Sequence, residues 1–267
     1  MFFLKSLRII IEMKFNHIIG NPPFGRLYLK IIRETLKYSD DHVVLSPIRW
    51  LQDPLAEYKR GSDWKKFGDI RRHISSLDII DKVTAQKLFD IGNLTDLGIY
   101  HLTPKGGWKQ NVNPIVEKIV AHSEDTFRGK LNDKNHDGYG VVLYTFVGGS
   151  GRHFDGTFTG EILHNGLRDD GTDYKIRTNQ CKGWNDFRIY NTINFDTRDE
   201  AENFKLYCES TLMKWFAVTC IMNNNATNYY NYFPFMPTYT HPWKDEDLFE
   251  YFGLTKEEVE IIENAIQ

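Results

Sequence analysis

The chain has few cysteines, and their spacing excludes two common kinds of site. Only three of the 267 residues are cysteine, Cys181, Cys208 and Cys220, and no two of them form a Cys-x-x-Cys pair. This usage is typical of a reducing compartment and argues against a disulfide framework or a structural zinc site. We therefore expect a cytoplasmic protein without a metal centre.

Long apolar runs are missing as well. No stretch reaches the roughly 18 to 20 apolar residues that a membrane-spanning helix requires. The apolar N-terminal stretch resembles a signal peptide only briefly, because Lys5, Arg8 and Glu12 interrupt it and no small-residue cleavage site follows. We expect a protein that does not enter a membrane.

A large excess of charge is also absent, since the net charge is only −3. That value does not identify a nucleic-acid-binding protein by itself. The charges are unevenly distributed, however, because residues 244–267 contain two basic and eight acidic residues.

The stretch at residues 59–72 carries a local positive excess, because Asp63 and Asp69 are its only acidic residues. Its basic residues are Lys59, Arg60, Lys65, Lys66, Arg71 and Arg72. The stretch predicts contacts with DNA phosphates, although a solvated helix face is an alternative.

What is present is ample material for a folded core. Hydrophobic residues make up 41% of the chain and aromatic residues 14%, which excludes a disordered protein. A chain of 267 residues can hold one large domain or two small ones. We place a domain at residues 1–104 and a second, glycine-rich and less regular one at residues 105–267.

The first domain has an alternating pattern of strands and helices. Residues 15–20 and 42–46 read as strands, and the apolar positions of residues 25–38 recur at helical spacing. A strand, a helix and a second strand predict a parallel pair. Residues 55–74 are expected to be helical, and residues 77–83 and 97–102 are expected to be two further strands around a loop at residues 90–96. Together these four strands would form half of a doubly wound sheet.

The second domain is expected to combine strands with C-terminal helices. The best strand candidates are residues 141–147 and 187–195, and residues 199–222 predict one helix that buries its aromatic face. Thr255 and Glu258 form a capping box that predicts the start of the last helix. The fold class is therefore α/β in the first part, followed by a mixed α+β region.

The most informative motif is Asn21-Pro22-Pro23-Phe24, which directly follows the strand at residues 15–20. Two successive prolines fix two φ angles and remove two backbone donors, so Asn21 is held in an extended conformation. A surface turn is the alternative interpretation, because Asn and Pro are both turn residues.

The motif resembles the catalytic loop of the amino-group methyltransferases that methylate N6 of adenine in DNA with S-adenosylmethionine. The segment Ser46-Pro47-Ile48-Arg49-Trp50 is similar to a second turn of that family. Residues 77–102 resemble the last strands of its catalytic sheet, residues 105–240 its target-recognition region, and residues 243–266 the end of its type IIG restriction-modification members. The resemblance implies a partial Rossmann-like methyltransferase sheet followed by a mixed α+β target-recognition region.

The resemblance also assigns roles to the four residues of the motif. Asn21 Oδ1 and the Pro22 carbonyl would accept hydrogen bonds from the adenine amino group, and Phe24 would stack on the base after it leaves the duplex. Pro23 belongs to the same catalytic loop. The implied partner is double-stranded DNA, and the implied methyl donor is S-adenosylmethionine.

The expected cofactor motif is not found before the catalytic loop. Only twenty residues precede Asn21, and they contain no glycine-rich loop. Residues 142–151 show a strand followed by glycines, but the residues after them are poor helix formers, so a β-hairpin is the preferred interpretation. A second chain that supplies the cofactor-binding half is one expectation, and the incomplete sheet then predicts an exposed strand edge at residues 15–20.

Two other classes of function remain open at this stage. The chain can be an inactive DNA-binding remnant of such an enzyme or a protein-interaction module derived from it. Residues 133–138 begin like a calcium loop, but the twelfth position is Tyr144 where glutamate is required, so a turn is expected there. The amides and aromatics of residues 223–234 suit base contacts or a packed loop equally well.

Overall fold

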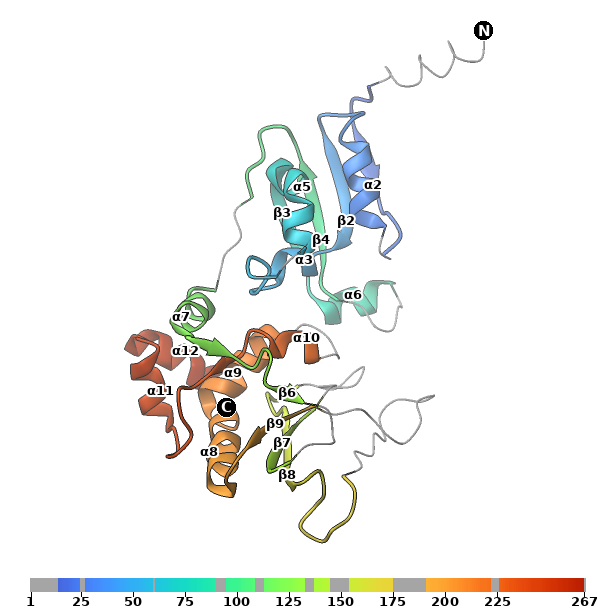
Figure 1. Cartoon of the computed structure of the whole chain (residues 1–267). Helices are drawn as coiled ribbons and strands as arrows, with labels where there is room; N and C mark the ends of the chain where they lie inside the picture. The colour runs from blue at the N-terminus through green and yellow to red at the C-terminus, as the bar shows by residue number, and fades with distance from the viewer. Residues whose placement is uncertain are drawn as a thin grey trace. The chain divides into compact units, whose positions relative to one another are not determined.

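The chain forms two units, Met1–Asn111 (unit 1) and Val112–Gln267 (unit 2), in a computed structural model (Figure 1). The structure describes residues 14–24, 27–59, 61–89, 95–108, 113–132, 137–144, 154–174, 191–221 and 226–266. Each unit combines helices with a sheet, in agreement with the α/β class expected from the sequence.

The boundary between the units lies a few residues later than expected. After the last strand of unit 1, the Thr103 backbone N–H donates to the His73 carbonyl at 2.7 Å, and the Gly107 N–H donates to the Ile74 carbonyl at 3.1 Å. These bonds hold the segment that follows residue 102 against unit 1. The change in composition at residue 104 therefore does not mark the end of the unit.

The sheet of unit 1 has four strands in the order β1-β2-β4-β3. They are β1 (Ile18–Gly20), β2 (His42–Pro47), β3 (Ile74–Ile80) and β4 (Leu97–Leu102). The strands β1 and β2 are parallel and joined by α2 (Tyr28–Thr35), which confirms the predicted parallel pair. The strand β4 is antiparallel to both β2 and β3. Only β1 and β2 therefore have the parallel arrangement expected of a doubly wound sheet.

Two short helices replace the single helix expected at residues 55–74. They are α4 (Asp63–Lys66) and α5 (Gly68–His73), and a further short helix, α3 (Arg49–Gln52), lies directly after β2. The side chain of Ser62 accepts a hydrogen bond from the Lys65 backbone N–H and so caps α4. A cap inside the segment starts a new helix at that point, which the charge pattern alone did not indicate.

The strand expected at residues 77–83 is also displaced. It begins earlier, at Ile74, and ends at Ile80, after which α6 (Lys82–Phe89) begins. The carboxylate of Asp81 accepts hydrogen bonds from the backbone N–H groups of Val83 at 2.9 Å and Thr84 at 3.0 Å. This cap favours a helix over a continued strand. Most of the loop expected at residues 90–96 lies outside the described residues.

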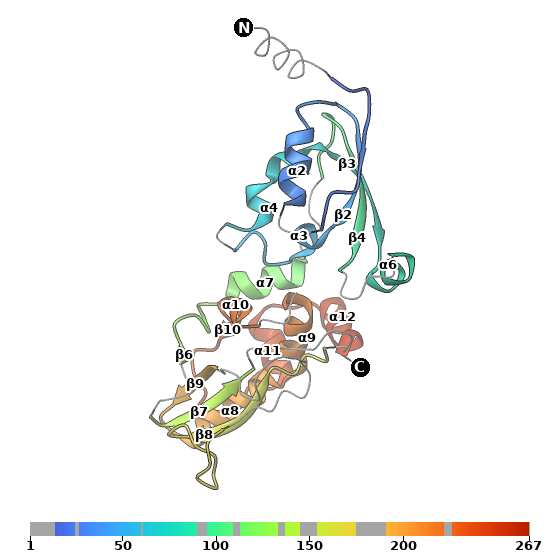
Figure 2. The ribbon, with the colours of Figure 1, turned by 90° about the vertical axis from the view of Figure 1, so that its right-hand side faces the viewer.

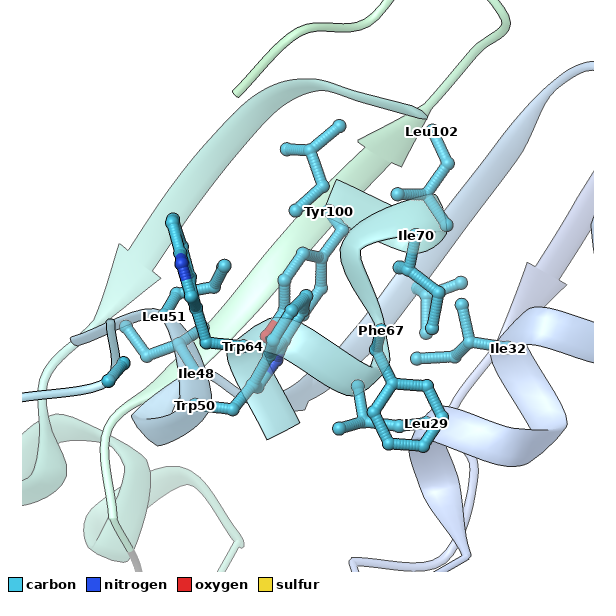
Figure 3. Close-up of a cluster of buried hydrophobic side chains, with 13 residues drawn as sticks. Leu29, Ile32, Ile48, Trp50, Leu51, Trp64, Phe67, Ile70, Tyr100 and Leu102 are labelled. Atoms are coloured by element: carbon cyan, nitrogen blue, oxygen red, sulfur yellow. The ribbon is translucent and has the colours of Figure 1, made fainter. Parts of the chain in front are cut away.

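The core of unit 1 lies on one face of its sheet. Figure 2 shows α2 and α4 on one side of the sheet and α6 on the other side, near one end. Figure 3 shows the core, in which aromatic rings from α3, α4 and β4 gather beside aliphatic side chains of α2. Its labelled members are Leu29, Ile32, Ile48, Trp50, Leu51, Trp64, Phe67, Ile70, Tyr100 and Leu102.

Unit 2 contains a four-stranded antiparallel sheet in the order β6-β9-β7-β8. Its strands are β6 (Leu131–Asn132), β7 (Tyr139–Leu143), β8 (Thr159–His164) and β9 (Asn191–Phe195). The antiparallel pairing of β7 with β8 confirms the hairpin expected around residues 142–151. The hairpin turn, most of the calcium-like segment and the N-terminal part of the strand expected at 187–195 lie outside the described residues.

The helices of unit 2 pack on one another and on that sheet. They are α7 (Pro114–His122), α8 (Arg198–Cys208), α9 (Thr211–Cys220), α10 (Thr227–Tyr230), α11 (Asp245–Tyr251) and α12 (Lys256–Ile266), and a small pair of strands, β5 (Asp125–Thr126) and β10 (Pro234–Phe235), accompanies them. The single helix expected at residues 199–222 is two helices, because Ser210 accepts from the Met213 N–H and starts α9.

The predicted capping box of the last helix is confirmed. The Thr255 N–H donates to Glu258 Oε2 at 2.8 Å, and the Glu258 N–H donates to Thr255 Oγ1 at 3.3 Å. No helix of the described residues is both long enough and apolar enough to cross a bilayer.

Candidate functional site

The Asn21 motif lies at the carboxyl end of β1. Its first residue, Asn21, is exposed, Pro22 is buried, Pro23 is exposed and the Phe24 side chain is half-buried. The strand before it is fixed by the Ile18 N–H, which donates to the Asp41 carbonyl at 3.0 Å. A buried proline next to an exposed amide anchors the backbone while the Asn21 side chain remains accessible to a ligand.

The carboxyl end of β2 lies beside the motif. The two strands are parallel, and Gly20 stands opposite Val44, so both chains leave the sheet at the same end. β2 ends at Pro47, and the chain continues through Ile48 into α3. Ligands of open α/β sheets bind outside the carboxyl ends of parallel strands. The sheet therefore places the motif where such a site is expected.

A small pocket of about 210 Å³ is formed by the helices that follow these two strands. Its aromatic walls are Tyr28 of α2, Trp50 of α3 and Trp64 of α4. An ion pair between Lys59 and Asp53, with 2.6 Å between Nζ and Oδ2, contributes opposite charges, and each of these side chains is only 18% exposed. Burial raises the pKa of the Tyr28 hydroxyl well above its usual value. The aromatic walls and the two opposite charges of this pocket suit a flat ring that carries polar groups.

A buried hydroxyl from β4 fixes the turn that leads into this pocket. Tyr100 Oη donates to the Pro47 carbonyl at 2.8 Å and accepts from Trp50 Nε1 at 3.2 Å. Burial raises the pKa of this hydroxyl, so it stays protonated and can donate. The Tyr100 ring thus holds the end of β2 and one wall of the pocket in place.

The predicted DNA-contacting residues are divided between different surroundings. Lys59 lies in the pocket, whereas Lys65, Lys66 and Arg72 are exposed on α4 and α5. Arg60 lies outside the described residues.

Arg71 is stacked on an aromatic ring of the core. Its guanidinium carbon is 3.6 Å from the ring centroid of Trp64, and its Nη1 is 3.7 Å from a carboxylate oxygen of Glu57. Burial lowers the pKa of Arg71, and the neighbouring charge of Arg72 lowers it further. The stretch is thus a partly stacked and partly exposed basic surface.

Arg33 of α2 joins this surface, a position that no local sequence pattern indicates. Its Nη2 donates to Asp69 Oδ1 at 2.7 Å and also to the Lys66 carbonyl, and its guanidinium carbon lies 4.3 Å from the Phe67 ring centroid. These contacts join α2 to α4 and α5. Arg33 and Asp69 are 36 positions apart, so only the fold brings them together.

The pair of Arg33 and Asp69 predicts a pH-dependent contribution to stability. Burial opposes ionisation of Asp69, but the hydrogen bond from Arg33 and its charge outweigh burial, so the pKa of Asp69 lies below its usual value. A carboxyl group whose pKa is lower in the folded state than in the unfolded state stabilises the fold at pH values above its unfolded-state pKa. This stabilisation is lost as the pH falls through its folded-state pKa. We expect Asp69→Asn to lower the free energy of unfolding by at most about 1 kcal/mol at pH 7.

Urea unfolding of the wild type and of Asp69→Asn between pH 7 and pH 3 checks this expectation. The two stabilities should converge at acidic pH. The matched control is Asp78→Asn on β3, since Asp78 is exposed and forms no ion pair within the described residues. A difference that stays constant down to pH 3 would contradict the assigned role of the pair.

The described residues contain no group of three or more His, Cys, Asp or Glu side chains suited to a metal ion. Comparison of the chain with protein-family models, with curated proteins and with solved structures found no match. The functional conclusion therefore depends on the geometry of the Asn21 motif and its surroundings.

Proposed function

We propose that the chain is the catalytic and target-recognition portion of a DNA adenine-N6 methyltransferase of the restriction-modification kind. The observation that supports the proposal most strongly is the position of Asn21. Its accessible amide follows the edge strand β1, which is parallel to β2, and lies on a proline-fixed loop beside the end of β2. In this proposal unit 1 binds the adenine and unit 2 contributes target recognition.

The residues of the motif can carry out a defined part of the reaction. The lone pair of the adenine amino nitrogen is delocalised into the ring, which makes the nitrogen a poor nucleophile. Hydrogen bonds from its two hydrogens to Asn21 Oδ1 and the Pro22 carbonyl favour a more tetrahedral and more electron-rich nitrogen. Phe24, which is half-buried, would stack on the base. Fixed acceptors of this kind need no reorganisation during the reaction.

The described residues of unit 1 do not fit S-adenosylmethionine. Pro22 and Pro23 follow β1, and β2 itself ends on Pro47, where a dinucleotide-type loop has glycines. The pocket of about 210 Å³ is also smaller than the roughly 300 to 1,000 Å³ of typical ligand pockets. When bound, this cofactor would supply an electrophilic methyl group. In this proposal a second chain holds it.

The basic surface of unit 1 would contact the DNA backbone. Lys65, Lys66 and Arg72 are exposed, and in this proposal they contact phosphates. Arg33 and Arg71 are held against the rings of Phe67 and Trp64, so less freedom is lost when they make such contacts. This arrangement gives non-specific affinity that falls with salt, while sequence would be read elsewhere.

Binding of an unpaired adenine tests the proposal without the cofactor. Two duplexes with randomised flanks carry the same central adenine, opposite thymine in one and opposite an abasic site in the other. A protein that takes the base out of the stack binds the unpaired adenine more tightly, because less stacking and pairing is lost. We expect about a tenfold difference in Kd by fluorescence anisotropy.

The preference should depend on the motif. Phe24→Ala is expected to remove it, while Phe15→Ala, which alters a 52% exposed aromatic ring before β1, should leave it intact. Equal affinity of the wild type for the two duplexes would overturn the assignment of unit 1 as the adenine-binding part.

A further inference from the structure

The two edges of the unit 1 sheet are built differently. The edge strand β3 has a register shift between Ile74 and Ser76, and Ser75, Ser76 and Asp78 on it are exposed and polar. Bulges and polar or charged side chains are the usual means of preventing a further strand from pairing with a sheet edge. The β3 edge is therefore protected against strand addition.

The β1 edge lacks that protection. Within the described residues β1 pairs only with β2, and Ile18–Gly20 contains no charge, proline or register shift. The Ile18 N–H points toward β2, where it donates to the Asp41 carbonyl. Because backbone groups alternate sides along a strand, the N–H and C=O of Ile19 point away from β2. The Ile19 side chain is 83% exposed.

An apolar stripe continues from this edge across one face of the sheet. Ile19 stands opposite Val43, and Leu45 stands opposite Ile99, in the register of the strands. Along β2, Val43 and Leu45 alternate with Val44, which points into the core. Val43 and Leu45, together with their partners Ile19 and Ile99, therefore lie on the face of the sheet away from α2 and α4 (Figure 2). Val43, Leu45 and Ile99 are only half-buried. The face that carries α6 is thus incompletely covered.

We propose that an α/β domain of a second polypeptide adds a strand beside β1 and covers this face. All-parallel sheets almost always have both faces covered, and the parallel strands β1 and β2 of this mixed sheet are covered by α2 on one face. The exposed Ile19 requires an apolar side chain on the added strand. Main-chain pairing supplies affinity in such strand addition, and the side chains that alternate along it supply specificity.

A second copy of this chain fits the edge poorly. Two copies of β1 related by a two-fold axis would pair in an antiparallel manner around Ile19. Pro23 would then stand opposite Phe15, where its backbone faces the other copy but has no N–H to donate. A strand parallel to β1 avoids this mismatch, since both strands leave the sheet at the same end. It also leaves the Asn21 loop uncovered.

The inference rests on the proposed function only for the expectation that the partner binds S-adenosylmethionine. Strand addition itself depends on the edge and face described above. The experiment replaces Ile19 with a photo-crosslinking phenylalanine analogue in the full chain, in cells that naturally make it. The matched control carries the analogue at Asp78 on the protected edge. Mass spectrometry identifies the crosslinked peptide.

The expected result is one polypeptide joined to position 19 and not to position 78. When purified, that polypeptide should slow hydrogen exchange at the Ile19 amide of the full chain. Ile19→Lys should weaken its binding at least about tenfold, while Ile79→Lys on β3, which alters a 57% exposed residue, should not. Both variants should melt at the wild-type temperature, because both side chains are exposed.

Three results would overturn the proposal. They are a crosslink from position 19 to another copy of the chain, a crosslink to the chain's own residues, and no crosslink at all. Methyl transfer by the purified pair is measured separately. A pair that forms through β1 but does not methylate DNA would refute the proposed function and leave the docking surface intact.

Discussion

Replacing Asn21 by alanine is expected to lower kcat for adenine methylation by the complex about 100- to 1,000-fold. The side-chain oxygen would act on charge that develops at the amino nitrogen during transfer, so its removal affects the transition state more than DNA binding. The Kd for DNA should change little. Steady-state methyl incorporation into duplex DNA measures the first quantity, and fluorescence anisotropy measures the second.

The control for this variant is Asn16→Ala. Asn16 is an exposed asparagine shortly before β1, and among the described residues only its backbone carbonyl takes part in a hydrogen bond, which it accepts from Ser39 Oγ. Its replacement should leave kcat within a factor of two or so. Full methylation by Asn21→Ala would contradict the catalytic role of the motif.

Replacing Phe204 by alanine is expected to lower the free energy of unfolding of unit 2 by about 3 to 5 kcal/mol. Phe204 has no exposed surface and lies at the centre of an aromatic cluster. Its ring centroid is 5.3 Å from that of Phe127 and 5.1 Å from those of Phe195 and Tyr239. Truncation would remove these contacts and leave a cavity among rigid rings that cannot close it.

A loss of that size is a large fraction of the stability of an ordinary domain. Hydrogen exchange of the α8 amides as a function of urea reports the opening of this unit directly. Leu206→Ala on the same helix is the control, because Leu206 is 54% exposed. Its effect should stay within about 0.5 kcal/mol. Equal destabilisation by the two variants would contradict the described core.

Local sequence signals predicted the parts of the fold that local interactions determine. The parallel pair of β1 and β2 follows from a strand, a helix and a strand in direct succession, and the capping box of Thr255 and Glu258 is complete within four residues. The buried face of α8 and α9 was visible as helical spacing. The break between them at Ser210 was missed, because a continuous apolar pattern hides a capping serine.

The surroundings of the candidate site could not be derived in this way. Tyr28, Trp50 and Trp64 belong to three helices and meet only when α2, α3 and α4 pack together. The contact of Arg33 with Asp69 likewise depends on the packing of α2 against α5. The motif could be recognised in the sequence because its four residues are adjacent, whereas the pocket between α2, α3 and α4 and the exposed edge of β1 are properties of the folded unit.

The most direct test of the central claim is the formation of N6-methyladenine. The complex that contains the full chain is purified from cells that naturally make it and is incubated with unmethylated DNA and S-adenosylmethionine, and the digested nucleosides are quantified by mass spectrometry. We predict N6-methyladenine with the wild type and its near-complete loss with Asn21→Ala. A complex that binds the DNA but yields no N6-methyladenine would contradict the account.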